Sequence, residues 1–262
     1  MDTAITRLDR AKNGAYAILQ RRTPDTLLIF VHGFGGNPTE TWCDFHNLLP
    51  EHDSSDMVFY SYSSFKCSTL SSAMDFLRFL QDLGRDTSQL TRGYSKLILV
   101  GHSEGSLLIR HALILAYSRD IEEELKQVLR KCQVALFAPA MFGFSPTGLV
   151  SILTSLGFVG STISSILRFS PAYVEMTEPN LLSNLKDQTE RLGERDPDAS
   201  CFRARVVFGR NEKVVGRGYF AFDTLWDDQP GKNHLTICKP KVNFLFPIHF
   251  ALNGRSRNEH LR

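Results

Sequence analysis

The sequence has few cysteines and no excess of either charge, and these two features exclude several classes of protein. Its five cysteines are odd in number, widely spaced and never arranged as a C-x-x-C pair. That pattern argues against a zinc site and predicts a reducing, cytoplasmic compartment. Thirty Lys and Arg residues are balanced by 28 Asp and Glu residues, which leaves a net charge of +2. Because the basic residues are scattered, we expect no nucleic acid partner.

Internal repeats, low-complexity linkers and a recognisable secretory signal are also missing. The first ten residues carry charges throughout, so they are not predicted to be a signal peptide. A chain of 262 residues without linkers predicts a single domain, residues 1–262, with a full core. Its patterns alternate between strand and helix throughout. This order predicts an α/β fold with a mostly parallel central sheet flanked by helices.

The same patterns give expectations for individual elements. Residues 15–20 are expected to form an edge strand, and residues 39–49 the first crossover helix. The last helix is expected to begin soon after His234. These boundaries depend on local composition alone.

The most informative motif lies between an apolar run and a helical pattern. Residues 96–100 (KLILV) lead directly into the sequence GHSEG at positions 101–105. This is G-x-S-x-G at a sharp strand-to-helix turn, which strains the serine backbone and holds the hydroxyl at the top of the sheet. Side chains at Gly101 and Gly105 would collide with the neighbouring strand or helix. The context favours Ser103 as a nucleophile over a structural serine.

A second apolar run ends in a glycine-rich loop. Residues 27–31 are followed by the sequence HGFGG at positions 32–36. A carbonyl attacked by serine develops negative charge on oxygen, and loss of one donor to that oxygen costs about 3–4 kcal/mol. The backbone N–H groups of Phe34 and Glu104 are the predicted donors of this oxyanion hole. The alternative is an ordinary tight turn. The residues expected to shape the loop are His32, Gly33 and Gly35.

Together the two loops resemble those of α/β-hydrolases, in particular the lipase and esterase branch. The resemblance extends from about Ala15 to the last helix. Within that fold, the chain is similar to GPI-inositol deacylases and serine-active-site phospholipid-remodelling proteins, whose histidine loop resembles residues 234–240 (HLTICKP). The resemblance implies a serine hydrolase that needs no metal or organic cofactor. It also implies a catalytic triad in the chain order serine, acid, histidine.

The resemblance places the acid after a late strand, three residues past the glycine that ends it. That glycine is Gly209, so the implied acid is Glu212, just before a valine pair. The alternatives are Asp223, Asp227 and Asp228. His234 is the expected base, because it follows a turn signal and lies in the histidine loop. The other histidines have different expected roles: His32 and His102 bracing the reactive loops, and His249 packing in the core or an interface.

One long segment carries no charge. No Asp, Glu, Lys or Arg occurs from Met141 to Leu167. We expect two short helices, 147–156 and 161–169, to form an apolar lid over the active site, within an insertion spanning residues 141–198. A lid of this kind suits a lipid or another acyl substrate. Alternatives are an oligomer interface, a membrane anchor over 147–169, or peripheral membrane contact through residues 141–169.

The expected reaction is hydrolysis of a carboxylic ester through an acyl-enzyme. Ser103 would attack the carbonyl carbon, His234 would take its proton, and Glu212 would orient the imidazole. A thioesterase or an acyltransferase would use the same triad, and a non-catalytic binding module of the same fold is a further alternative. Glu104 is an unusual neighbour for the nucleophile, because a carboxylate facing the pocket would repel the oxyanion.

Overall fold

One sheet organises the part of the chain that the computed structural model describes, residues 3–8, 15–20, 25–51, 55–85, 94–119, 121–155 and 157–253. Within these residues its strand order is β1-β2-β4-β3-β5-β6-β7-β8. β2 is antiparallel to β1 and β4, and the other neighbouring pairs are parallel. The strands are β1 (Thr3–Leu8), β2 (Ala15–Gln20), β3 (Thr26–Val31), β4 (Asp56–Tyr60), β5 (Lys96–His102), β6 (Gln133–Phe137), β7 (Arg205–Val207) and β8 (Thr224–Leu225). The predicted mostly parallel sheet is therefore confirmed.

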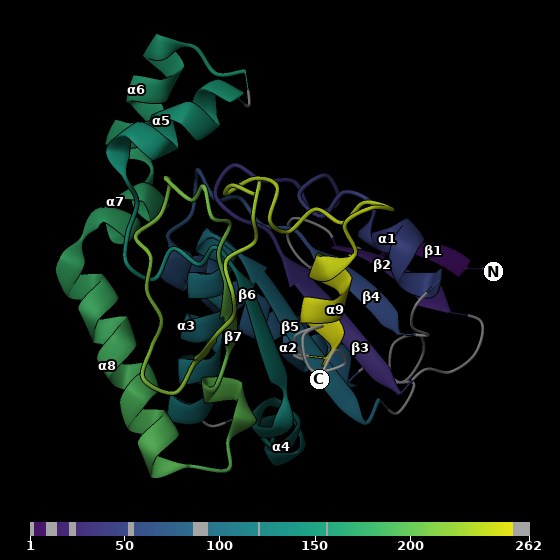
Figure 1. The fold of residues 1–262 in the computed structure, drawn as a ribbon. Helices are drawn as coiled ribbons and strands as arrows, with labels where there is room; N and C mark the ends of the chain where they lie inside the picture. Colours follow the sequence, from purple (N-terminus) through teal and green to yellow (C-terminus); the bar gives the residue numbers. More distant parts are fainter. Residues whose placement is uncertain are drawn as a thin grey trace.

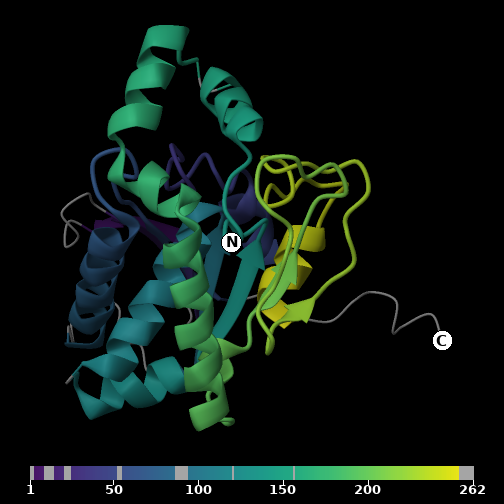
Figure 2. The same ribbon diagram turned by 90° about the vertical axis from the view of Figure 1, so that its left-hand side faces the viewer.

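Helices flank this sheet (Figure 1). Figure 2 shows α2, α3 and α8 on one side of the sheet and α9 on the other. The α-helices are α1 (Phe45–Leu48), α2 (Thr69–Arg85), α3 (Glu104–Ser118), α4 (Glu123–Lys131), α5 (Pro146–Ser155), α6 (Gly160–Phe169), α7 (Pro171–Thr177), α8 (Pro179–Arg195) and α9 (Phe246–Asn253). Two short 3-10 turns cover Leu49–Glu51 and Ser200–Phe202.

The central strands lie in the core. β3, β5 and β6 are built almost entirely of apolar residues, and nearly all of their side chains are buried. Near-continuous apolar strands are typical of parallel sheets that helices cover on both faces. α3 is also buried along most of its length, since it packs against β5 and against helices α2 and α8. The connection between β5 and α3 is therefore buried among neighbouring elements.

The two predicted reactive loops meet at one edge of the sheet. β3 and β5 are parallel neighbours, with Val31 opposite Gly101 in the register. The loop at residues 32–36 and the turn at Ser103 consequently leave the sheet side by side. Ligands of open α/β sheets bind outside the carboxyl ends of the strands. This edge is therefore the place to look for a site.

The expectation that residues 15–20 form an edge strand is wrong. They form β2, but β1 pairs with it over its whole length and takes the edge position. β1 has the alternating sequence TAITRL, which is short and lies in a charged segment. Its pairing with β2 is a tertiary contact that local composition does not reveal.

The crossover helix expected over residues 39–49 is also much shorter than predicted. Only Phe45–Leu48 is α-helical. The Asn37 side chain accepts hydrogen bonds from the backbone N–H groups of Thr39 (2.9 Å) and Glu40 (3.2 Å), which fixes a turn. Cys43 then has a φ of 51°, a left-handed conformation that interrupts a helix.

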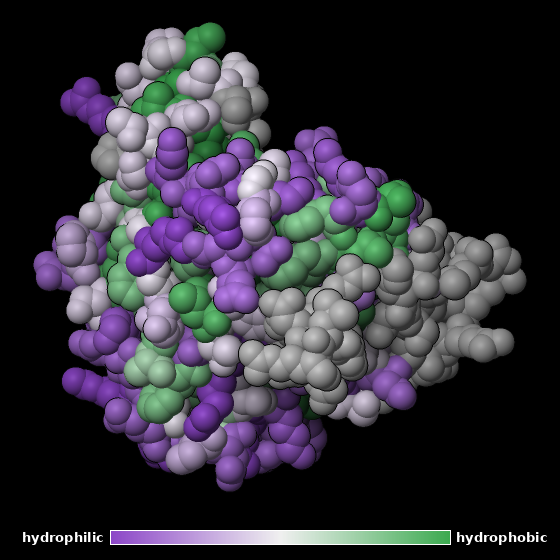
Figure 3. Space-filling view, in the orientation of Figure 1, coloured by the Kyte–Doolittle hydropathy of each residue, from purple (hydrophilic) through white to green (hydrophobic). Residues whose placement is uncertain are grey.

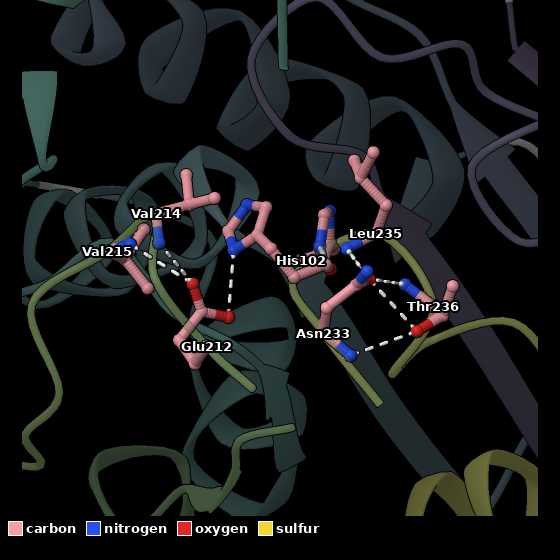
Figure 4. Close-up of polar contacts among 8 residues, drawn as sticks. His102, Glu212, Val214, Val215, Asn233, Leu235 and Thr236 are labelled. Carbon is pink, nitrogen blue, oxygen red and sulfur yellow. Dashed lines mark hydrogen bonds and ion pairs between the residues drawn. The ribbon is translucent and has the colours of Figure 1, made fainter. Parts of the chain in front are cut away.

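The last helix begins at Phe246, well after His234. Asn233 explains the delay, because its side-chain oxygen accepts the N–H groups of Leu235 and Thr236, both at 3.1 Å. These bonds close a turn directly after the histidine (Figure 4). The prediction that this stretch starts the last helix is therefore wrong.

α5 and α6 stand clear of the sheet at its carboxyl edge in both ribbon views (Figures 1 and 2). Their bounds agree with the two helices predicted for the uncharged segment. Among the described residues, no helix is long and apolar enough to cross a membrane. α5 buries Leu149, Ile152 and Leu153, whereas Val150 is exposed. Val159 and Phe169 are also exposed, so this part of the chain carries apolar side chains outside as well as inside, and Figure 3 shows apolar and weakly polar side chains together on its visible face.

Candidate active site

Ser103 has the strained backbone expected of a residue at a sharp turn. Its φ of 54° and ψ of −122° place it outside the regions that non-glycine residues prefer, at a cost of about 1–3 kcal/mol. The turn is fixed by two bonds, from Ser103 N to Phe137 O (3.1 Å) and from Ser106 N to Ser103 O (3.1 Å). The strain is therefore imposed by the neighbouring strand and by α3.

Two glycines allow the loops to pack this closely. A Cβ atom on Gly105 would lie 2.2 Å from the carbonyl oxygen of Val31, so any side chain there would displace β3 from α3. A Cβ atom on Gly33 would lie 2.7 Å from Cβ of Ser103. The loop at 32–36 therefore lies directly against the nucleophile turn, as the sequence predicted.

Both predicted oxyanion donors lie beside Ser103. Glu104 is the first residue of α3, where backbone N–H groups have no acceptor within the helix. Phe34 lies in the glycine-rich loop, which is held by bonds from Gly36 N to Gly33 O (2.9 Å) and from Gly35 N to Ser64 Oγ (2.8 Å). Phe34 lines the same cavity as Ser103.

Glu212 and His234 form a buried hydrogen-bonded pair at the same edge. Nδ1 of His234 lies 3.1 Å from Oε2 of Glu212, and both side chains are shielded from solvent. Oε1 of Glu212 accepts the N–H groups of Val214 (2.7 Å) and Val215 (3.2 Å) (Figure 4). Because Oε1 is fully occupied by the backbone, Oε2 is held toward the imidazole.

The same contacts keep Glu212 ionised. Burial alone would raise the pKa of its carboxyl, but the bonds from His234 and from the two valine N–H groups hold the pKa below its ordinary value. An ionised carboxylate can accept a hydrogen bond from the Nδ1–H group and stabilise a positively charged imidazole. That leaves Nε2 as the free basic atom, and it is buried with no hydrogen-bond partner among the described residues.

Ser103 and His234 line one cavity of about 120 Å³. No hydrogen bond joins Oγ of Ser103 to Nε2 of His234, which has no partner among the described residues. Catalytic hydrogen bonds of this kind are often long in unliganded structures and tighten when substrate binds. The cavity is smaller than the roughly 300–1,000 Å³ of pockets for drug-sized ligands, so it fits a reacting group and its immediate neighbours. Its lining residues are Gly33, Phe34, Gly35, Gly36, Asn37, Glu40, Thr41, His102, Ser103, Ile152, His234, Leu235, Cys238 and Lys239.

The two flanking histidines brace the loops. Nε2 of His102 lies 2.8 Å from the carbonyl oxygen of His234 and therefore donates to it, fixing the backbone of the expected base. Burial lowers the pKa of His102 well below its ordinary value and lowers the pKa of His32 to about 4, so both are neutral. The bracing contact of His102 spans 132 positions of sequence, and no local signal could have located it.

Two of the three alternative acids, Asp223 and Asp228, have other partners. Asp223 forms a fully buried ion pair with Arg110 of α3 and accepts the backbone N–H groups of Ala204 (2.9 Å) and Phe220 (3.0 Å). Asp228 pairs with Arg217 at 2.5 Å. Asp227 is exposed. None of the three is bonded to His234 in the described part of the chain, so Glu212 alone has the geometry of an orienting acid.

Glu104 directs its carboxyl away from the cavity. The residue is fully buried, does not line the cavity, and has Tyr62 and Thr69 as polar neighbours. Burial raises the pKa of this carboxyl well above its ordinary value, and the carboxylate of Glu175 raises it further. A neutral acid adds no negative charge beside an oxyanion. The unusual neighbour noted in the sequence is therefore compatible with the chemistry.

The buried Glu104 predicts a pH-dependent stability. Because its pKa is raised in the folded protein, its stabilising contribution is complete below the unfolded value, about 4.3, and is lost as pH rises above it. We expect the unfolding free energy of Glu104→Gln, minus that of the wild type, to grow by up to about 1.4 kcal/mol per pH unit above that value. Urea denaturation between pH 4 and pH 8 measures this difference.

The matched control is Glu124→Gln, which changes an exposed glutamate near the start of α4. Its stability difference from the wild type should be nearly independent of pH. A constant offset for Glu104→Gln across the same range would show that Glu104 ionises normally.

One family model matches part of the chain. Residues 21–142 match the family described as "Putative serine esterase (DUF676)", a stretch that contains the glycine-rich loop and the Ser103 turn. The search of curated protein sequences finds no match. Within the described residues, no group of three or more His, Cys, Asp or Glu side chains is placed to hold a metal ion.

Solved structures share the fold at low sequence identity. The peroxisomal alpha-beta-hydrolase Lpx1 of Saccharomyces cerevisiae is 13% identical over 99% of this chain and 86% of its own, with a TM-score of 0.53. A bacterial membrane phospholipase A is 14% identical over 90% and 81%, with a TM-score of 0.50. A carboxylesterase of Nitrososphaera gargenis is 12% identical over 90% and 92%, also with a TM-score of 0.50.

The fold and the nucleophile turn define an α/β-hydrolase. The family match over residues 21–142 supports an α/β-hydrolase that acts on ester bonds. That match ends before Glu212 and His234, so their roles depend on the geometry described above.

Proposed function

We propose that the protein hydrolyses carboxylic esters of lipids or other acyl compounds with a Ser103–His234–Glu212 triad. The observation that carries this proposal is the buried pair of His234 and Glu212 beside the strained Ser103 turn. One carboxylate oxygen is fixed by two backbone N–H groups and the other by Nδ1. An ordinary surface ion pair would not require this fixed arrangement at the edge of a cavity.

In the acylation step, Nε2 of His234 removes the hydroxyl proton of Ser103 as Oγ attacks the carbonyl carbon. The carbonyl oxygen becomes negatively charged and accepts the N–H groups of Phe34 and Glu104. When the tetrahedral intermediate collapses, the carbon–oxygen bond to the alcohol breaks and His234 returns the proton to the leaving oxygen. The acyl group then remains bound to Ser103 as an ester.

In the deacylation step, His234 takes a proton from water as the water oxygen attacks the acyl-enzyme. Collapse of the second intermediate breaks the bond to Oγ, returns the proton to Ser103 and releases the carboxylic acid. Glu212 stays ionised in both steps and stabilises the imidazolium. No step needs a group other than those of the chain and water.

Glu212→Gln tests the proposed acid. The amide can still occupy the site, but it cannot stabilise a charged imidazole, and the equivalent change in a serine protease lowers kcat by about 10⁴. We expect a fall of between about 10² and 10⁴ in kcat for p-nitrophenyl acetate, with little change in Tm.

Asp223→Asn is the matched control for Glu212→Gln. It removes one charge of the buried pair with Arg110, and breaking such a pair costs about 3–5 kcal/mol. The folded fraction of this variant should keep its kcat while its Tm falls. A larger loss of kcat in Asp223→Asn than in Glu212→Gln would show that the acid is misplaced.

We also propose that α5 and α6 are a lid over residues that receive the acyl chain. Ile152 of α5 lines the cavity with Ser103, whereas its neighbours Leu149 and Leu153 are fully buried behind it. A cavity of about 120 Å³ cannot enclose a long chain, so α5 would have to shift for the remainder of the chain to reach Leu149 and Leu153.

The lid predicts a chain-length effect. Burial of each methylene contributes about 0.8 kcal/mol, so kcat/KM of the wild type should rise by up to about fourfold per methylene until the apolar surface is covered. Ile152→Ser should lower kcat/KM on octanoate and decanoate esters about tenfold more than on acetate, since it removes part of that surface. p-Nitrophenyl esters of graded length provide the measurement.

The control is Val150→Ser on the outer side of α5, where the side chain is 39% exposed. It should leave the chain-length profile unchanged. If Val150→Ser instead releases the protein from lipid vesicles and Ile152→Ser leaves the profile unchanged, the helices bind membranes and do not cover the substrate.

A further inference from the structure

We infer that residues 62–65, between β4 and α2, are a positioning segment that holds the oxyanion loop and connects it to the lid. This inference rests on the proposed role of Phe34 as an oxyanion donor. The segment provides no atom to the cavity. Its contacts with the loop and with the lid nevertheless make it the main support for the Phe34 backbone.

The segment fixes the backbone on both sides of Phe34. The Tyr62 ring stacks on His32 at 4.4 Å between centroids and 13° between planes, and its hydroxyl donates to the His32 carbonyl oxygen at 2.8 Å. On the other side, Ser64 Oγ accepts the N–H of Gly35 at 2.8 Å. The peptide that presents the Phe34 N–H is therefore held at both ends.

The third contact is made by side chains. The Phe65 ring packs edge-on against Phe34, with centroids 4.9 Å apart and planes at 87°. Phe34 is buried, whereas Phe65 is only half-buried. Without Phe65, one side of the Phe34 ring would lose its packing partner, and the ring could rotate together with its backbone.

The same segment contacts the lid at two points. Phe65 packs edge-on against Phe158, in the turn between α5 and α6, with centroids 5.6 Å apart and planes at 83°. The Ser170 hydroxyl, between α6 and α7, lies 3.5 Å from the carbonyl oxygen of Ser64 and donates to it. Both ends of α6 are thus linked to the segment that supports the oxyanion loop.

These links give the lid a role in the chemical step. A donor must lie 2.7–3.1 Å from the oxyanion, and a misplacement of about 1 Å can cost about 10² in rate. If the contacts from Phe158 through Phe65 to Phe34 fix the position of the Phe34 N–H, a closed lid raises turnover. It does so even for a substrate that is too small to contact the lid. A lid that only binds acyl chains would change KM for long substrates and leave acetate turnover unaffected.

The test compares two phenylalanines of the lid. Phe158→Ala removes the contact with Phe65, whereas Phe169→Ala removes a ring that is 72% exposed and packs on Arg168. With p-nitrophenyl acetate, we expect Phe158→Ala to lower kcat about three- to tenfold with KM unchanged, and Phe169→Ala to have no effect. Phe158 is only partly buried and Phe169 is exposed, so folding should be preserved.

A second readout isolates the oxyanion. An aryl trifluoromethyl ketone forms a tetrahedral adduct with Ser103, and its inhibition constant should rise by the same factor as kcat falls in Phe158→Ala. Phe65→Ala should lower kcat about tenfold, and Phe65→Ala with Phe158→Ala should be no worse than Phe65→Ala alone. Phe65→Leu, which keeps an apolar side chain in contact with Phe34, should recover part of the loss.

Other results would overturn the inference. If the losses of kcat multiply when Phe65→Ala is combined with Phe158→Ala, the two rings act independently. If the variants change Tm but not kcat, the segment is only structural. Failure of the proposed function is a different result. In that case the wild type would neither hydrolyse the acetate ester nor form the ketone adduct.

Discussion

Alanine at position 103 is expected to abolish ester turnover while leaving the fold intact. Removal of the nucleophile of a catalytic triad lowers kcat by about 10⁶, and the residual rate comes from the oxyanion hole and from binding. The positive φ of Ser103 is imposed by neighbouring elements and is tolerated equally by alanine, so stability should change little. Steady-state kinetics with p-nitrophenyl acetate, together with Tm, measure both effects.

Ser106→Ala is the matched control. Ser106 lies one turn further along the same segment, is fully buried, and its hydroxyl has no hydrogen-bond partner among the described residues. Loss of this hydroxyl should leave kcat within about twofold of the wild type, because no hydrogen bond to a described residue is lost with it. Wild-type turnover by Ser103→Ala would remove the basis of the proposed mechanism.

Replacing His234 with alanine should lower kcat by at least about a thousandfold, because no other group can take the Ser103 proton. The only other imidazole that lines the cavity, within the described residues, is that of His102. Its Nε2 donates to the carbonyl oxygen of His234, and burial holds its pKa well below the ordinary value. It is therefore poorly suited to replace the base.

The control for His234 is His249→Ala on α9, which should affect mainly stability. His249 is half-buried and does not line the cavity. A loss of kcat in His249→Ala comparable with that in His234→Ala would mean that the base has been assigned to the wrong loop.

The parts of the protein that the sequence predicted well are those specified by consecutive residues. The turn at Ser103 and the loop at 32–36 each follow an apolar strand, and parallel neighbouring strands bring their ends together. Helices α5 and α6 could also be located, because a long stretch without charge is broken by glycines. In each case, the signal and the structure occupy the same short segment.

The parts that could not be predicted depend on contacts between distant residues. β1 takes the edge of the sheet by pairing with β2, and the helix expected over 39–49 gives way to turns fixed by the Asn37 side chain. The acid could be assigned only through resemblance, because no spacing rule links Glu212 to His234 across 22 positions.

The direction of the Glu104 carboxyl illustrates the same limit. Its motif position suggests a charge beside the oxyanion, whereas burial shields the carboxyl from solvent and raises its pKa well above the ordinary value. The positioning segment at 62–65 has no periodic pattern or motif of its own. Its importance comes from three partners in the loop at 32–36, which lies about 30 positions earlier.

The most direct test of the central claim is the site of covalent labelling by a fluorophosphonate. The wild-type protein is treated with the probe, digested, and the modified peptide is identified by mass spectrometry, with Ser103→Ala and His234→Ala treated in parallel. We predict one modified residue, Ser103, no labelling in Ser103→Ala, and labelling slowed by at least about a thousandfold in His234→Ala. A label on another residue, or labelling that survives the loss of Ser103, would contradict the account.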